Sequence, residues 1–333
     1  MVLRRLLDAY RRSGADLPFG NPARAHGSAM EGYYWRIVDA PGGSVIVLLC
    51  GVCQGPEGPW ATVAVASHPG GFVRHAVIAP AAGRRECFGV RAAETLHGSA
   101  EGLHAQLGDD AWIDLRTRSP VLWPRPVFGA LGPAQAVPGL GQYWHPVVLA
   151  ARVEGQACIG GLPVRLDGAT AYAEKNWGPR FAGHWWWGHA GAFPGGDVTV
   201  AFAGGRLAIA GRVVPPTAVV VRLGKQVLRL APPLARVRVR ATDRTWAIRA
   251  HSLRHRVEIE GYAGDAAPHV LPVPDVTTGR VDMRSKQYLA GRLRLRVSRG
   301  ERTVFEGESP LAGLERGVPA PSLSDPPRGE QPP

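Results

Sequence analysis

Two stretches of the chain repeat one pattern: EGYYWRIVDAPGGSVIVLL at residues 31–49 and GHWWWGHAGAFPGGDVTVAF at residues 183–202. Each has an aromatic triplet, then a Pro-Gly-Gly turn, then an apolar run. The proline follows the last aromatic residue by six positions in the first copy and by seven in the second. Pro-Gly-Gly is also common turn chemistry, so a chance likeness between two hairpins is the alternative. The pattern predicts tandem β domains of similar build.

Short β-branched runs separated by glycine and proline continue along the chain, as in WATVAVAS, TAVVVRL and RVEIEGY. Helical periodicity is clear only in the first dozen residues. Many short strands with few crossover helices favour antiparallel barrels or sandwiches. We therefore predict an all-β protein with a short N-terminal helix and two tandem antiparallel β-barrel or sandwich domains, at residues 1–170 and 171–317. The Pro-rich residues 318–333 are expected to be disordered.

The net charge of +12 is unevenly distributed along the chain. Between residues 206 and 256, twelve arginines and lysines stand against Asp243 alone. Many of them alternate with apolar residues, as in ARVRVRA, which is the period of a strand with one solvated face. No motif of a nucleic-acid-binding fold accompanies the charge, so we predict no nucleic-acid partner.

The sequence predicts a cytoplasmic protein. Its longest apolar run, SVIVLLCGV, is about half of the ~18 residues that a spanning helix needs. The opening MVLRRLLDAYRRSG lacks the apolar core of a secretory signal. Its arginines around leucines are also typical of a helix in peripheral contact with a membrane, the alternative to an ordinary surface helix.

The four cysteines do not predict a metal site. Cys50 and Cys53 have a CxxC spacing that can bind zinc or exchange thiols, but no second pair completes such a site. They end an apolar strand, so we expect buried small residues. No metal and no cofactor are predicted.

The stretch AYAEKNWGPRFAGHWWWGHA, residues 171–190, combines an acid with many aromatic rings. We interpret AEKNWG as a polar loop, and in the strand that follows Trp185 and Trp187 share one face. A carboxyl at Glu174 among tryptophans would have a raised pKa and could donate a proton, while the rings would stabilise a cation. The pattern favours carbocation chemistry; the alternative is a Glu174–Lys175 ion pair at a turn, with tryptophans that only pack two domains together.

The same residues resemble the tocopherol cyclase family, in which an EKNWG block precedes W-x-W. MEGYYWRI, GQYWHPV and the segment HRVEIEGYAGDAAPHVLPVPDVTTG are similar to further blocks of that family, in the same order. The resemblance runs from about residue 20 to residue 297. It implies two lipocalin-like β-barrels. It also implies a cofactor-free reaction, in which an alkene of a lipophilic prenylated quinol is protonated and the phenolic oxygen closes a chromanol ring on the carbocation.

By position, the resemblance implies Glu174 and Glu31 as catalytic carboxyls. Ala182, His189 and Gly191 depart from the family pattern near the expected head group, which leaves the identity of the quinol open. The residues expected to contact the substrate are Tyr34, Trp35, Tyr143, His145, Lys175, Asn176, Trp177, Phe181, Trp185, Trp187 and His189.

Three other functions fit parts of the pattern. A non-catalytic carrier of isoprenoids or quinones would use the same cavity without the acid, leaving Glu174 at the surface beside Lys175. An isoprenoid hydratase would share the protonation step but let water capture the cation. A scaffold protein would show an exposed tryptophan patch with no cavity behind it.

Overall fold

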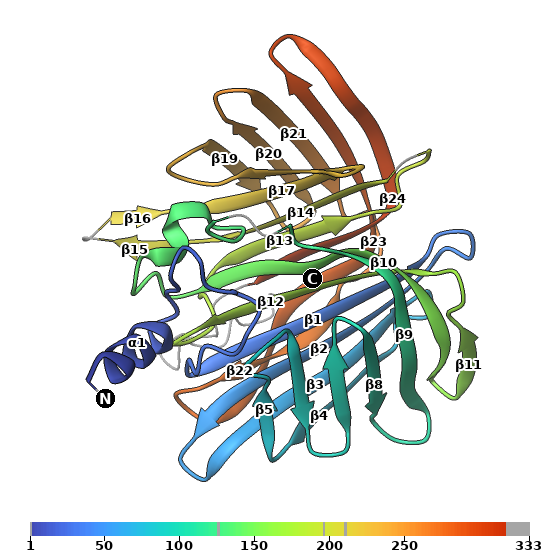
Figure 1. Ribbon diagram of the computed structural model, residues 1–333. Coiled ribbons are helices and arrows are strands. Elements are labelled where there is room, and N and C mark those ends of the chain that lie inside the picture. The colour runs from blue at the N-terminus through green and yellow to red at the C-terminus, as the bar shows by residue number, and fades with distance from the viewer. Residues whose placement is uncertain (1, 125–126, 196, 210–211, 318–333) are drawn as a thin grey trace, which may run out of the picture.

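The computed structural model describes residues 2–124, 127–195, 197–209 and 212–317. Two large antiparallel sheets make up most of the fold, and α1 (Val2–Arg12) projects beside them (Figure 1). The prediction of an all-β protein with a short N-terminal helix is therefore confirmed. The predicted tail at residues 318–333 lies outside the described residues.

The first sheet has twelve strands in the order β4-β3-β2-β1-β12-β10-β9-β8-β7-β6-β5, with β11 paired to β10. Its end strand β5 lies against β2 and β3, so the sheet closes almost completely into a barrel around a core of apolar side chains. Its strands are β1 (Met30–Asp39), β2 (Ser44–Gly55), β3 (Gly58–His68), β4 (Val73–Ile78), β5 (Ala81–Gly83), β6 (Gly89–Ala92), β7 (Leu96–Ser99), β8 (Gly102–Gln106), β9 (Ala111–Leu122), β10 (Tyr143–Ile159), β11 (Leu162–Arg165) and β12 (Thr170–Gly178). A short 3₁₀ helix, η1 (Gly132–Ala136), lies between β9 and β10.

The second sheet has ten strands in the order β18-β17-β14-β13-β24-β23-β21-β20-β19, with β22 paired to β23. Strands β17 and β19 approach each other, so this sheet is also a nearly closed barrel with its own apolar core. Its strands are β13 (Trp185–Ala190), β14 (Val198–Gly205), β17 (Thr217–Leu223), β18 (Gln226–Leu230), β19 (Arg236–Ala241), β20 (Thr245–His251), β21 (His255–Tyr262), β22 (His269–Asp275), β23 (Arg280–Arg299) and β24 (Arg302–Gly317). Strands β15 (Leu207–Ile209) and β16 (Arg212–Val214) form a separate hairpin.

The two copies of the repeated sequence pattern each form an antiparallel hairpin. The first copy gives β1 and β2 in the first barrel, and the second gives β13 and β14 in the second barrel. The basic strand β19 has the predicted solvated face, since Arg236, Arg238 and Arg240 are exposed in alternation with half-buried residues. The repeated motif thus located the two hairpins, and the alternation of residues located the basic strand.

The sequence AEKNWG is not a loop, and the prediction of one is wrong. It lies in β12, which pairs with β1 on one side and β10 on the other. The chain therefore passes to the second sheet after Gly178, and the expected boundary at residues 170 and 171 cuts through a strand of the first barrel. Both faces of β12 are buried, so it lacks the alternation of apolar and exposed polar residues that identifies a strand.

The two barrels pack against each other through their outer faces. Apolar side chains from both contribute to this layer, among them Tyr34 and Leu149 of the first barrel and Trp187, Val220 and Leu289 of the second. Strand β22 extends the contact, because it lies against β2, β3 and β4 of the first barrel. The cavity described below lies in this layer between the barrels.

Candidate functional site

A cavity of about 690 Å³ lies between the two barrels. Strands β1, β2, β10 and β12 line it from the first barrel, and β13, β14, β22 and β24 from the second. Residues of η1 and of the β15–β16 hairpin complete its wall. The volume is in the range of sites for small organic ligands, and the predominantly apolar lining suits a lipophilic one.

Strand β12 turns alternate side chains to opposite environments. Glu174 and Asn176 line the cavity, and Tyr172 belongs to the layer between the barrels. Lys175 and Trp177 point the other way, toward the segment that precedes β1, where Lys175 Nζ and Trp177 Nε1 donate to backbone carbonyls. The acidic residue and the lysine of EKNW are therefore not a pair, and only the former belongs to the cavity.

The carboxyl of Glu174 is held by three aromatic donors. Its Oε2 accepts hydrogen bonds from Tyr172 Oη at 2.6 Å, from Trp144 Nε1 at 2.8 Å and from Trp187 Nε1 at 2.8 Å. Within the described part of the chain, no group donates a hydrogen bond to Oε1. This oxygen keeps some solvent-accessible surface, although Glu174 as a whole is only 4% exposed. Because Glu174 lines the cavity, we assign that surface to it.

Burial raises the pKa of the Glu174 carboxyl from its ordinary 4.5 to about 7. The hydrogen bonds from Tyr172, Trp187 and Trp144 act in the opposite direction, and the nearby Glu315 raises the pKa further. An indole N–H only donates, so Oε2 with its three donors is the carbonyl-like oxygen of the protonated acid. The proton of the acid then resides on Oε1, at the cavity.

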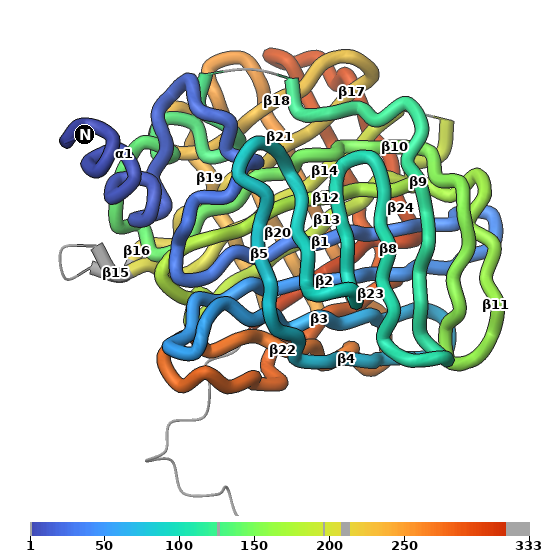
Figure 2. The backbone as a smooth tube through the Cα atoms, turned by 60° about the horizontal axis from the view of Figure 1, so that its bottom comes forward, coloured from blue at the N-terminus to red at the C-terminus, as the bar shows by residue number. Residues whose placement is uncertain are grey.

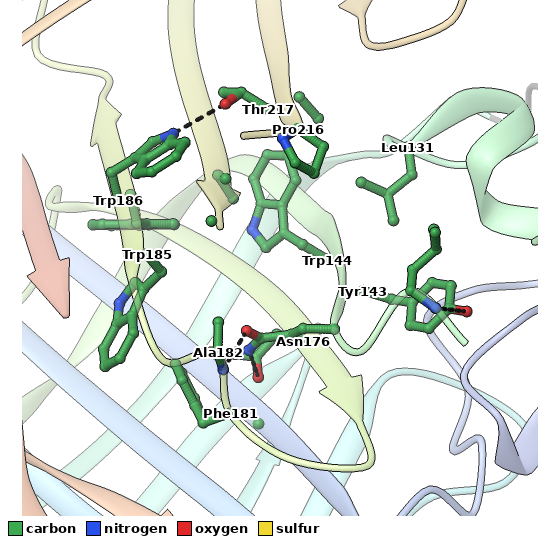
Figure 3. Close-up of a pocket in the computed structure, with 18 of the residues that line it drawn as sticks. Leu131, Tyr143, Trp144, Asn176, Phe181, Ala182, Trp185, Trp186, Pro216 and Thr217 are labelled. Atoms are coloured by element: carbon green, nitrogen blue, oxygen red, sulfur yellow. Dashed lines mark hydrogen bonds between the residues drawn. The ribbon is translucent and has the colours of Figure 1, made fainter. Parts of the chain in front are cut away.

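The three consecutive tryptophans of β13 follow the predicted alternation. Trp187 donates to Glu174, and Trp185 donates from Nε1 to Oε1 of Glu315 at 2.6 Å. Trp186 borders the cavity too, but it packs in the core of the second barrel, and its Nε1 donates to the Thr217 hydroxyl at 3.0 Å (Figure 3).

The ring of Trp185 can lie against β24 because its cross-strand partner on that strand is a glycine. Trp185 pairs with Gly205 of β14 and Gly317 of β24. A Cβ at Gly317 would overlap the Trp185 ring, so only glycine leaves space for that ring at this position.

Four more of the predicted substrate contacts also line the cavity, namely Tyr34, Tyr143, Asn176 and Phe181. Tyr34 meets the Trp187 ring edge-on, with ring centroids 5.1 Å apart. Phe181 tilts against Trp185 at 4.7 Å. The hydroxyl of Tyr143 donates to the Val137 carbonyl at 2.5 Å, which fixes that ring at the side of η1.

A second carboxyl in the cavity, Glu315, was missed by the sequence analysis. Its register partner on β13 is Trp187, so Glu315 shares the face of the tryptophans that line the cavity. Its Oε2 accepts from Gln287 Nε2 at 2.8 Å, and Gln287 Oε1 lies 3.4 Å from the Tyr34 hydroxyl. Burial raises the pKa of Glu315. The single glutamate in PLAGLERG gives no local signal of this role, because only strand pairing places it beside Trp187.

Glu31 does not reach the cavity, contrary to its predicted catalytic role. It forms a buried ion pair with Lys175 at 2.7 Å and accepts from the backbone N–H groups of His26 and Gly27 at 2.8 and 2.7 Å. Burial alone would raise the pKa of Glu31, but the Lys175 ammonium and these bonds hold it below its usual range. Trp177 stacks on His26 at 4.2 Å in the same cluster. Lys175 and Trp177 are therefore not cavity residues either.

Trp35, His145 and His189, also predicted as substrate contacts, lie outside the cavity. Trp35 is in the core of the first barrel. His145 accepts at Nδ1 from the Ala130 N–H at 3.3 Å, and burial lowers its pKa to about 3. His189 stacks on Tyr172 at 3.9 Å, behind Glu174. The sequence analysis did not identify which side of each strand faces the cavity.

No group of histidine, cysteine, aspartate or glutamate side chains in the described ranges could hold a metal ion. Cys50 and Cys53 are buried, as predicted, and burial raises the pKa of both free thiols. None of the helices in the described segments is long and apolar enough to cross a membrane. Among the described lining residues of the cavity, the carboxyls are those of Glu174 and Glu315, and they lie among aromatic rings.

A model of the tocopherol cyclase-like family matches residues 140–318, which include Glu174, Glu315 and the cavity tryptophans. The chain belongs to the tocopherol cyclase-like family. Strand β1 of the first barrel, which carries Glu31 and Tyr34, precedes the matched residues. No curated protein matches the chain.

Solved structures similar to this tocopherol cyclase-like protein cover most of its length. CghA is 13% identical with a TM-score of 0.58, and CghA with Sch210972 is 12% identical with a TM-score of 0.57; each match covers 87% of this chain and 88% of that chain. Kievitone hydratase from Nectria haematococca is 11% identical over 89% of this chain and 91% of that chain, with a TM-score of 0.49. At these identities the likeness to CghA concerns the fold alone. The two barrels and the family match confirm the predicted lipocalin-like fold, and the family match supports an isoprenoid-related enzyme.

Proposed function

We propose that this protein closes a chromanol ring on a lipophilic prenylated quinol, with Glu174 as the proton donor. The proposal rests on the raised pKa of that carboxyl and on the contacts of its two oxygens. Burial raises its pKa to about 7, three donors occupy Oε2, and no described residue donates to Oε1, which lies at a cavity between aromatic rings. A general acid works best with a pKa near the operating pH.

The first step is proton transfer to an alkene carbon of the bound chain. The Oε1–H bond of Glu174 breaks, a C–H bond forms, and the positive charge develops on the tertiary carbon. The negative charge that Glu174 gains is stabilised by the hydrogen bonds from Tyr172, Trp144 and Trp187. These fixed donors lower the barrier, because they bind the carboxylate more strongly than the neutral acid.

The aromatic rings of the cavity then stabilise the carbocation. Tyr34, Trp144, Trp185 and Trp187 line the same space as the acid, and the faces of such rings attract cations. An apolar wall also keeps water from adding to the cation. Trp187 would act twice, through its N–H on the carboxyl and through its ring on the cation.

Ring closure requires an acceptor for the phenolic proton, and we assign it to Glu315. The phenolic oxygen forms the C–O bond to the tertiary carbon, and its O–H bond breaks as the proton passes to the Glu315 carboxylate. Exchange with water between turnovers returns one proton to Glu174 and removes one from Glu315. The product is an isomer of the substrate, so the reaction needs no electron donor or acceptor.

Two of the alternative functions have signatures that differ from this site. The carrier reading expects Glu174 at the surface beside Lys175, whereas Glu174 is buried and Lys175 pairs with Glu31. The scaffold reading expects no cavity behind the tryptophans, whereas one of about 690 Å³ is present. Hydration of the alkene shares the first step of the proposed reaction, so only the product distinguishes a hydratase from a cyclase.

The test is to incubate the purified protein with a series of prenylated quinols under anaerobic conditions and analyse the products by chromatography and mass spectrometry. We expect a chromanol of unchanged mass from the wild-type protein and at least a hundredfold slower formation by Glu174→Gln. A product one water heavier would identify a hydratase instead. Tight binding of unchanged quinol by both proteins would refute catalysis and leave a carrier.

A further inference from the structure

Helix α1 exposes an apolar face that nothing in the described chain covers. Val2, Leu3 and Leu6 are 71%, 70% and 62% exposed, and no residue of the helix is buried. At 3.6 residues per turn, positions 2, 3, 6 and 7 lie on one side of the helix. A surface helix of a soluble protein normally turns such a stripe to the core, so the exposed leucines of α1 require another explanation.

The opposite side of α1 is basic. Arg4, Arg5 and Arg12 are exposed there, and Asp8 is the only acid of the helix. Arg11 is engaged differently, since it pairs with the buried Asp16. A short helix with leucines on one side and arginines on the other has the chemistry that binds in the interface of an anionic bilayer.

The last turn of α1 and the residues that follow it are fixed to the wall of the cavity. The Tyr10 hydroxyl donates to the Ala136 carbonyl of η1 at 2.8 Å, and the Asp16 N–H donates to the Gln135 carbonyl at 2.9 Å. Residues of η1 line the cavity together with Val137, which follows it directly. The earlier turns of α1 project away from both barrels (Figures 1 and 2).

The cavity opens on this side of the molecule. Among its described lining residues, those classed as exposed are Val137, Pro215, Pro232 and Pro233. Val137 lies one residue from Ala136, the residue that holds Tyr10 of α1. The exposed leucine helix therefore stands at the rim of an apolar cavity, and a surface that binds the helix would also face the opening.

We propose that α1 is a membrane-docking helix, which lies on an anionic lipid surface with its leucines in the acyl boundary and its arginines at the headgroups. The opening of the cavity is then held against the bilayer, and a lipophilic molecule can enter without crossing water. A second copy of the chain fits this face less well, because two such helices would bring like charges together. Docking does not depend on the proposed reaction; only the entry of a quinol by this route rests on it.

The test uses the full chain with a C-terminal tag, which leaves α1 free, and flotation with vesicles that contain no quinol. We expect binding to vesicles of phosphatidylcholine mixed with phosphatidylglycerol, weaker binding at high salt, and little binding to phosphatidylcholine alone. The double variant Leu3→Glu/Leu6→Glu should lose at least about tenfold in affinity, since it removes apolar burial and adds negative charge. Arg4→Ala should lose roughly fivefold.

A matched control is Leu162→Glu. Leu162 is 70% exposed, as Leu3 is, and starts β11 at the end of the molecule opposite α1 (Figures 1 and 2). This variant should bind vesicles as the wild-type protein does. Circular dichroism checks that every variant is folded, and Leu3→Ala/Leu6→Ala provides a second, helix-compatible test of the apolar face.

Several results would overturn the proposal. These are failure of the wild-type protein to bind anionic vesicles, equal binding to neutral ones, or unchanged binding by both leucine double variants. If gel filtration shows that Leu3→Glu/Leu6→Glu converts a dimer to a monomer without affecting flotation, α1 is an interface between copies. Chromanol formation from detergent-dispersed quinol should be unchanged in this variant and slower from vesicle-embedded quinol. An absence of all chromanol would refute the reaction but not the docking.

Discussion

Replacing Trp187 by phenylalanine should move the pH dependence of the reaction. Trp187 Nε1 donates to Glu174 Oε2 at 2.8 Å, and this bond is stronger to the carboxylate than to the neutral acid. Phenylalanine keeps an aromatic wall but has no N–H. The variant therefore stabilises ionised Glu174 less, and the pKa of the carboxyl should rise above about 7, its value with all three donors in place.

The size of this change follows from the type of bond. A hydrogen bond to a charged group contributes about 1.5–3 kcal/mol, and 1.36 kcal/mol corresponds to one pH unit, so we expect a rise of at least about 1. The reaction requires protonated Glu174, so kcat/KM of the wild-type protein should fall above about pH 7. In Trp187→Phe the fall should begin at about pH 8 or above. The plateau rate should also decrease because an indole ring beside the cation is lost.

The assay is the pH profile of kcat/KM for chromanol formation, with the chromanol measured by chromatography. Trp186→Phe is the matched control, since this neighbouring indole donates to Thr217 rather than to Glu174 and should leave the midpoint in place. A carbon-13 label in the glutamate side chains would report the same titration by NMR without turnover. A midpoint that stays near the wild-type value, or moves down, would refute the role of Trp187 in setting the acidity of Glu174.

Three further variants separate the two carboxyls of the cavity from the buried ion pair. Because the folded-state pKa of Glu174 is raised from 4.5 to about 7, its ionisation destabilises the protein as pH rises through this range, by about 3 kcal/mol in total. Glu174→Gln should therefore unfold at higher urea than the wild-type protein at about pH 8 but not at about pH 4, and an equal difference at both would contradict the raised pKa. Glu31→Gln should lower the free energy of unfolding by about 3–5 kcal/mol, because Lys175 is left buried without its partner. The rate of chromanol formation per folded molecule should not change. A slower reaction with unchanged stability would instead support a catalytic role of Glu31. Glu315→Gln should slow chromanol formation about a hundredfold with quinol binding retained, and an unchanged rate would assign the phenolic proton to another acceptor.

Much of the fold was predictable because local patterns carry it. Apolar runs bounded by glycine and proline turns form the strands of the two barrels, as SVIVLLC does in β2. The repeated aromatic triplet marked one hairpin in each barrel, and both hairpins contribute side chains to the layer between the barrels. Strand β12 was the exception. It carries Glu174, Lys175 and Asn176, and polar residues on a strand that is buried on both sides resemble a loop in sequence.

The site was only partly predictable. The alternation of side chains along a strand correctly paired Trp185 with Trp187 and set Trp186 apart. The same rule, applied to EKNW, would have separated Glu174 from Lys175, but it required knowing that the segment is a strand. Glu315 could not be found from local pattern at all, because its position beside Trp187 depends on pairing between strands over a hundred residues apart.

The sequence by itself determined that two all-β halves form and that an acid lies among tryptophans near residue 174. These properties depend on the period of apolar residues and on the composition of one short stretch. The tertiary structure decided which of these side chains meet. A side chain on a barrel strand points either to the barrel interior or to its outer face, and strand pairing and the packing of one barrel on the other fix which residues enclose a cavity. That packing turned Glu174 and Glu315 to one cavity and left Glu31 with Lys175 outside it.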